Sequence, residues 1–149
     1  MKYFVSIILI SLFFSCATDV CNQRTAWPAQ AGFYKISSLG KDSVVTADSL
    51  SLWGLNNDSL IYTNLNKKTI EFPLAIANSS STFVFKIKSK YDTITVYHTN
   101  TPYLISKQCG YGYQQEIDSV VYTQHLFTKI TWKVPQADKN DKENIQIYY

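Results

Sequence analysis

The chain is poor in the residues that enzymes use most often for chemistry. Its 149 residues include two histidines, three cysteines and five scattered glycines. No Gly-x-Ser-x-Gly turn and no glycine-rich phosphate loop occurs, and neither His98 nor His125 lies within a catalytic motif. Serine–histidine catalysis requires a histidine held between a nucleophile and an orienting group. We therefore expect no catalytic residue, no cofactor and no enzymatic activity.

Charged residues are scarce as well. They make up 17% of the chain, and the formal net charge is +3. Lys86, Lys88 and Lys90 alternate along the sequence, as side chains on one exposed strand face do, and they form no wider basic stripe. Proteins that bind nucleic acids concentrate Lys and Arg on such a stripe. Nucleic acid is therefore not an expected partner.

No group of residues has the spacing of a metal site or of paired catalytic carboxylates. The run Asn56–Ser59 lacks the regular acidic spacing and the glycine of a calcium loop. Glu116 and Asp118 share one strand face on either side of Ile117, which is typical of a strand with one side in water. We expect no bound metal and a solvated role for these two carboxylates.

The chain has one long apolar run, at its N-terminus. A predominantly apolar stretch from Tyr3 to Phe14 follows Lys2 and leads through Ser15 to Cys16. A dozen residues are too few to cross a hydrocarbon core of ~30 Å as a helix, so an uncleaved anchor or a buried strand is disfavoured. Residues 1–15 are instead predicted to be a lipoprotein signal peptide, and the residues before Cys16 resemble a bacterial lipobox. Cys16 would then be the lipidation site that holds the protein to a membrane.

The residues after Cys16 bear on location and on domain organisation. Ala17 occupies the position at which an Asp would retain a lipoprotein at the inner membrane. The outer membrane of a Gram-negative-type bacterium is therefore the expected location. The sequence does not distinguish between its periplasmic face and its outer face. We predict a lipidated N-terminus and short linker over residues 16–31 and a single domain over residues 32–149.

The remaining two cysteines form an even pair in an oxidising compartment. We expect a disulfide between Cys21 and Cys109, with free thiols or a metal site as the alternatives. Closing a loop of nearly ninety residues would stabilise the fold by about 4 to 5 kcal/mol.

Short alternating runs rich in Val, Ile, Thr, Tyr and Phe predict an all-β fold. We expect an antiparallel β-sandwich that is immunoglobulin-like, with a partly closed β-barrel as the alternative. Residues 82–88 and 93–98 read as a hairpin, and residues 135–143 as a mobile loop. The expected strands are 33–37, 43–46, 49–55, 59–63, 68–72, 82–88, 93–98, 103–107, 113–122, 128–134 and 144–148.

Aromatic residues are abundant, with eleven tyrosines among them. Tyr111 and Tyr113 alternate with glycines beside Cys109, and together with Tyr97 they are possible binding residues, since exposed tyrosines stack on sugars or anchor proteins. Packing within the sandwich is the alternative role. Trp53 and Trp132 are expected in the core.

Four features stand out along the chain: Cys21 shortly after the lipobox, Leu50–Leu60, Phe72–Leu74, and Leu104–Tyr111 with its Cys-Gly-Tyr motif. In these features the chain resembles a family of small bacterial envelope lipoproteins that is known only as a domain of unknown function. The resemblance implies a single-domain lipoprotein in which Cys21 and Cys109 belong together. It implies no activity, ligand or catalytic residue.

These observations predict a lipid-anchored, non-enzymatic component of the bacterial envelope. We expect it to contact the membrane through its N-terminal lipid and to bind another envelope protein. A small glycan- or peptide-binding module that uses the exposed tyrosines is the alternative.

Overall fold

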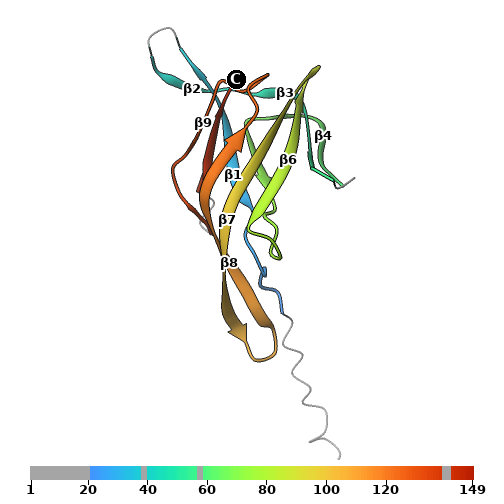
Figure 1. Ribbon diagram of the computed structural model, residues 1–149, viewed down its shortest axis with the longest axis vertical. Helices are drawn as coiled ribbons and strands as arrows, with labels where there is room; N and C mark the ends of the chain where they lie inside the picture. Colours follow the sequence, from blue (N-terminus) through green and yellow to red (C-terminus); the bar gives the residue numbers. More distant parts are fainter. Residues whose placement is uncertain (1–20, 38–39, 57–58, 139–141) are drawn as a thin grey trace, which may run out of the picture.

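The computed structural model describes residues 21–37, 40–56, 59–138 and 142–149, which form eleven β-strands and no helix (Figure 1). Cys16 and the predicted signal peptide lie outside the described residues. Within the described part of the chain, no helix is long and apolar enough to span a membrane. The six-stranded sheet has the order β10 (Gln136–Ala137), β8 (Gly110–Tyr122), β7 (Lys90–Ser106), β6 (Ser80–Ile87), β3 (Ala47–Gly54) and β4 (Leu60–Lys67). The five-stranded sheet has the order β2 (Asp42–Val44), β1 (Ala29–Ile36), β11 (Ile145–Tyr148) and β9 (Lys129–Trp132), with β5 (Thr69–Phe72) also paired to β1.

The two sheets enclose one apolar core, which confirms the prediction of an all-β sandwich. Phe72 of the five-stranded sheet packs edge-to-face on Phe83 and Phe85 of the other sheet, and Phe85 packs in the same manner on Phe127. Edge-to-face aromatic pairs stabilise a core beyond the area that they bury. Neighbouring strands are antiparallel apart from β1 and β11, which pair in parallel.

The sandwich is continuous along one edge. Strand β4 belongs to the six-stranded sheet and β5 to the five-stranded sheet, and Lys68 alone separates them. The Lys68 carbonyl accepts a hydrogen bond of 3.0 Å from the Phe33 backbone N–H, so the crossing is bonded to β1. The fold thus combines the predicted sandwich with one feature of the alternative, a partly closed barrel.

Alternation along the chain correctly predicted the hairpin of β6 and β7. Phe83 is paired with Ile94 and Phe85 with Asp92, and the apolar members of this face are buried in the core. Val96 and His98 are buried on the same side, because side chains two residues apart on a strand share a face. Tyr97 faces the opposite way.

Strand β7 is much longer than predicted, because the segment around Pro102 does not interrupt it. Pro102 is paired with Tyr113, whose backbone N–H donates to the Thr25 carbonyl and hence points away from β7. Residues of such a pair exchange no hydrogen bonds, so Pro102 removes none from the ladder. Strands β7 and β8 therefore continue beyond Ser80, the first residue of β6, as a two-stranded extension, which we call the arm and define as residues 101–114 (Figure 1).

Other differences from the sequence-based expectations arise at the edges of the sheets. Strand β1 begins at Ala29, inside the stretch predicted as a linker, because the small side chains of Ala29 and Ala31 fit fully buried positions. Residues 136–137 of the predicted loop form β10 on β8. Trp132 is 43% exposed because it ends the edge strand β9, and Trp53 faces outward, so the prediction that both belong to the core is wrong.

Strand β11 occupies the middle of its sheet, between β1 and β9, and both of its faces are buried. Its outer face is covered by the side chain of Glu143, which accepts hydrogen bonds from the Tyr34 hydroxyl and from Gln146 Nε2. A Cβ atom at Gly32 would overlap the Glu143 carboxylate. Glycine at position 32 is therefore what allows this acid to lie flat on the sheet.

Candidate functional site

The arm is fastened to the N-terminal part of the described chain. Cys21 and Cys109 form a disulfide with a Cα–Cα distance of 5.4 Å. Further along, the Tyr113 N–H donates to the Thr25 carbonyl at 2.6 Å, and Ala26 forms a parallel bridge with Tyr113. The segment that leads from Cys21 to β1 thus follows the edge of β8, and Figure 1 shows it running beside the arm.

Tyr111 and Tyr113 lie on one side of this arm. Tyr111 is 64% exposed and is paired directly with Leu104, which is 56% exposed. Tyr113 is paired with Pro102 in the same manner and is half-buried. Residues directly opposite one another in an antiparallel pair project from the same face. The arm therefore presents a continuous apolar and aromatic strip with Leu104 and Tyr111 at its outer end.

The two glycines that alternate with these tyrosines have separate structural roles. A Cβ atom at Gly112 would lie 2.8 Å from the ring of Tyr103, which covers this position from the opposite strand. Gly110 has a φ of +73°, which glycine adopts without a steric penalty. The strand register also shifts beside the disulfide, between Leu104 and Ser106.

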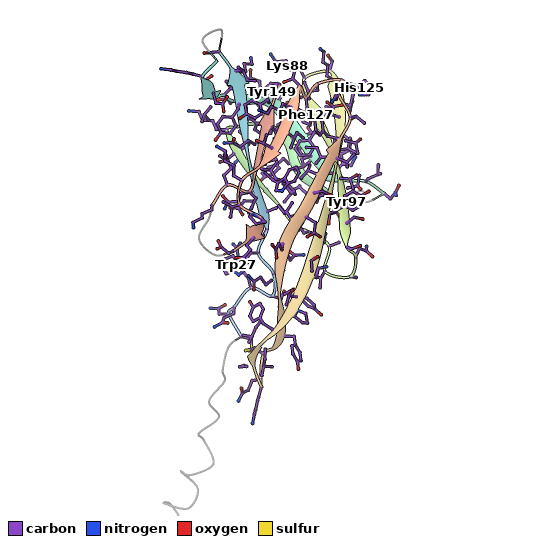
Figure 2. The ribbon with its side chains drawn as sticks, turned by 60° about the vertical axis from the view of Figure 1, so that its left-hand side comes forward. Trp27, Lys88, Tyr97, His125, Phe127 and Tyr149 are labelled. Carbon is purple, nitrogen blue, oxygen red and sulfur yellow. A yellow bond between two sulfur atoms is a disulfide. The ribbon has the colours of Figure 1, made fainter. Side chains whose placement is uncertain are left out.

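Tyr97 does not join the other two tyrosines. It is seven residues from Leu104 along β7, about 23 Å at the rise of a strand, and it projects from the opposite side of the sheet. It is 45% exposed and lies on the outside of the six-stranded sheet (Figure 2). Its outward-facing neighbours on β6, β7 and β8 form a surface with no charged side chain. We call this surface the threonine–tyrosine face; it consists of Thr82, Val84, Thr93, Thr95, Tyr97 and Val121.

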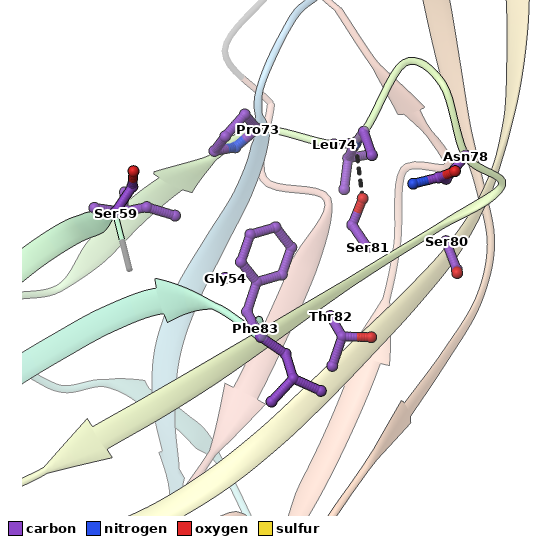
Figure 3. Close-up of a pocket in the computed structure, with 12 residues that line it drawn as sticks. Gly54, Ser59, Pro73, Leu74, Asn78, Ser80, Ser81, Thr82 and Phe83 are labelled. Carbon is purple, nitrogen blue, oxygen red and sulfur yellow. Dashed lines mark hydrogen bonds between the residues drawn. The ribbon is translucent and has the colours of Figure 1, made fainter. Parts of the chain in front are cut away.

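A pocket of about 450 Å³ lies at the end of the six-stranded sheet, between β3 and the loop that joins β5 to β6. Residues of β3, β4, β6 and this loop line it, among them Gly54, Pro73, Leu74 and Ser81 (Figure 3). Ser81 is almost completely buried in its wall, and its hydroxyl oxygen accepts a hydrogen bond of 2.7 Å from the Ala75 N–H.

Behind this wall, Ser81, His98 and Asn100 form a hydrogen-bonded chain. Asn100 directs its amide nitrogen to the carbonyls of Ala75, Ile76 and Asn78, so its oxygen faces His98 and accepts a bond of 3.1 Å from Nδ1. Burial lowers the pKa of His98. The neutral ring therefore accepts at Nε2 from the Ser81 hydroxyl, over 3.0 Å.

A hydroxyl, an imidazole and an orienting side chain occur in the same order in catalytic triads. The contacts of Ser81 and Asn100 nevertheless indicate a structural role for this network. An amide in the third position does not stabilise a charged imidazole as a carboxylate does. The Ser81 oxygen is also held by the Ala75 N–H, and the Asn100 amide binds the backbone of the same loop. The network fixes the loop of residues 73–79 against β7.

Asp92 accepts several hydrogen bonds at the other end of the molecule. Its buried carboxylate accepts hydrogen bonds from the Thr123 hydroxyl, the His125 ring, and the backbone N–H groups of His125, Leu126 and Phe127. Burial on its own would raise the pKa of Asp92, but these hydrogen bonds lower it below its ordinary value. Asp92 therefore anchors the crossing from β8 to β9 and positions Phe127 in the core. Asp92 lay in a predicted turn, and no local pattern marked it.

The family comparison covers most of the domain described above. A family of unknown function, DUF6452, matches residues 49–149. The chain belongs to this family. The searches of curated proteins and of solved structures returned no match. The DUF6452 region extends from β3 to β11 and contains the arm, the threonine–tyrosine face and the Ser81–His98–Asn100 chain.

Within the described residues, no group of three or more His, Cys, Asp or Glu side chains could hold a metal ion. A second cavity, of about 220 Å³, lies where the arm joins the sandwich. Two aromatic residues, Trp27 and Tyr103, line it together with Gln114, Ala137 and Asp138. Trp27 comes from the stretch predicted as a linker, and the side chain of Arg24 lies over its ring. No sequence motif marked this aromatic pair.

Proposed function

We propose that the protein is a non-enzymatic lipoprotein of a bacterial outer membrane that binds another envelope protein through the threonine–tyrosine face. The observation that carries this proposal is the character of that face. Its six residues include no charged side chain, whereas Lys86, Glu116 and Asp118 lie at its margins. Protein interfaces have the same arrangement, with charge depleted at the centre, tyrosine enriched, and a polar rim.

The disulfide supports the cellular location in this proposal. Disulfides persist in compartments outside the cytosol, and Cys21 lies five residues after the predicted lipidation site, Cys16. Replacing Cys16 by Ala is expected to release the protein from membranes, because no acyl chain would then be attached. Membrane fractionation measures this. Cys21→Ser is the matched control and is expected to keep its membrane attachment; a Cys16→Ala protein that stays with the membrane would contradict the lipid anchor.

Site-specific photocrosslinking in intact cells tests the partner-binding face. A photoreactive residue is placed at Tyr97 or at Val121 in the lipidated protein, and at Ile36, which is 55% exposed at the end of β1, as a control. One discrete protein adduct is expected from both positions 97 and 121 and is not expected from position 36. An absence of adducts at both test positions, or the same adducts at all three, would refute this binding face.

A second candidate function is glycan binding, which the cavity beside Trp27 and Tyr103 favours. Sugar rings stack on aromatic side chains, and the nearby amide and carboxylate of Gln114 and Asp138 are of the kind that orients hydroxyl groups. Titration with soluble peptidoglycan fragments, followed by tryptophan fluorescence, tests it. Binding that disappears in Trp27→Ala and persists in Trp132→Ala would support it, and unchanged fluorescence throughout would count against it.

A further inference from the structure

The outer end of the arm exposes apolar side chains that nothing in the described protein covers. Leu104 and Tyr111 are both more than half exposed and lie opposite one another, with Tyr103 on the other side of the same two strands. Single exposed apolar side chains are common on protein surfaces, whereas neighbouring ones can mark contact with a partner or a membrane. All three residues belong to the arm. The end of the arm lies away from the rest of the sandwich (Figure 1).

The chain itself holds this end of the arm close to its predicted lipid. Five Cα–Cα steps separate Cys16 from Cys21, which limits their separation to about 18 Å. Cys21 is bonded to Cys109 at the turn of the arm, and Tyr111 is two residues further on. A lipid on Cys16 would therefore keep Leu104 and Tyr111 within reach of the bilayer surface.

The composition of the arm suits an anionic lipid surface. Residues 101–114 contain no Asp or Glu, although the chain has 11 acidic residues, and their one charged residue is Lys107, which is exposed in the turn. Tyrosine is enriched at the interface between lipid and water, and lysine is attracted to anionic headgroups.

The backbone limits how deeply the arm can enter the bilayer. Beyond the end of β6, the outer edge of β7 has no neighbouring strand among the described residues. Unpaired backbone groups are tolerated in the hydrated interfacial layer and are excluded from the hydrocarbon core. Contact is therefore restricted to the interface. Tyr103 packs on Gly112 across the two strands of the arm, and the disulfide fastens the turn of the arm to Cys21.

We propose that the end of the arm lies on the bilayer and that Leu104 and Tyr111 enter its interfacial layer. This inference rests on the lipid anchor of the proposed function. Two contacts, the lipid and the arm, would then orient the protein. The threonine–tyrosine face, which begins about 23 Å further along β7, would stay clear of the membrane and free for a partner protein.

The test uses the lipidated protein in vesicles of phosphatidylethanolamine and phosphatidylglycerol with brominated acyl chains, which quench tryptophan on contact. Tryptophan replaces Leu104 in one variant and Tyr111 in another, and Ile36→Trp, at an equally exposed position, is the control. Emission of the unsubstituted protein is subtracted to remove the signal of its own three tryptophans. Two independent positions guard against a variant that does not fold.

Loss of emission and a blue shift are expected for the tryptophan at 104 and at 111, and neither is expected at 36. Flotation of the same vesicles separates this proposal from the anchor. Protein that does not float refutes the lipid anchor, and with it the basis of this inference. Protein that floats with no quenching at 104 and 111, or with the same quenching at all three positions, overturns the arm contact while the anchor stands.

Discussion

Replacing Asp92 by Asn should strongly destabilise the fold although it changes the shape of the side chain very little. One carboxylate oxygen accepts from the Leu126 and Phe127 N–H groups at 2.7 and 2.6 Å, and the other accepts from Thr123 and His125. An amide has one oxygen, so in either orientation its NH₂ group faces donors that have lost their acceptor. Each buried donor without a partner costs about 1–3 kcal/mol, so two such donors predict a total loss of about 2–6 kcal/mol in the free energy of unfolding.

The loss should also depend on pH in a defined direction. The folded pKa of Asp92 lies below that of the unfolded chain, near 3.9. The wild-type carboxylate therefore contributes its full stabilisation above pH ~5, and this contribution is lost as the pH falls through the lowered folded value. The Asp92→Asn variant has no charge at this position, so the difference between the two proteins should be constant at neutral pH and should shrink below pH ~4.

Urea unfolding followed by tryptophan fluorescence, with the disulfide intact, measures both effects. Asp48→Asn is the matched control, because Asp48 is half-exposed and its ion pair with Lys88 is a surface contact of 3.8 Å. Such surface pairs contribute about 0–1 kcal/mol. A loss at Asp92 no larger than at Asp48, or a difference that stays the same down to the most acidic conditions, would refute the anchoring role assigned to this carboxylate.

Three further predictions concern the arm and the core. Cys21→Ser and Cys109→Ser should each reduce the free energy of unfolding by a similar amount, up to about 4–5 kcal/mol for a separation of 88 residues, and the double variant should be no worse in urea unfolding; additive losses would argue against the bond. Gly112→Ala should lower the free energy of unfolding by about 1–3 kcal/mol, because the new Cβ would lie 2.8 Å from the Tyr103 ring. The loss should be much smaller when Tyr103 is also replaced by Ala, and an equal loss in both backgrounds would show that the ring is not the cause. His98 should titrate with a pKa below 6.5 when followed by NMR, because burial lowers its pKa. The free energy of unfolding should therefore be constant above pH ~6.5 and should decrease as the pH falls toward the pKa of the folded protein. A measured pKa of 6.5 or more would contradict the neutral, buried ring.

Local alternation predicted the hairpin of β6 and β7 because a strand places successive side chains on opposite faces whatever its partner is. The same rule placed Ile117 in the core between the exposed side chains of Glu116 and Asp118. The alternation rule failed at a strand on the edge of its sheet. Trp132 follows the apolar pattern and is exposed, because β9 ends at an edge with less core to cover it.

The candidate sites were less predictable than the strands. Tyr111 and Tyr97 are exposed, as binding residues must be, but they lie on opposite sides of one sheet and about 23 Å apart along β7. Sequence reasoning could not separate them, because it treated β7 as two strands. The continuity across Pro102 depends on the Tyr113 N–H pointing to Thr25, a partner from the far N-terminal side of the domain.

The sequence by itself determined the properties that neighbouring residues share: the strands and their inner faces, the scarcity of charge, and the absence of acid in the arm. The tertiary structure alone decided which distant residues meet. It paired β1 with β11, closed one edge of the sandwich at Lys68, and surrounded Asp92 with donors 31 to 35 residues away. The physical reason is that alternation is set by backbone geometry over two residues, whereas burial of a carboxylate is favourable only once distant N–H groups are assembled around it.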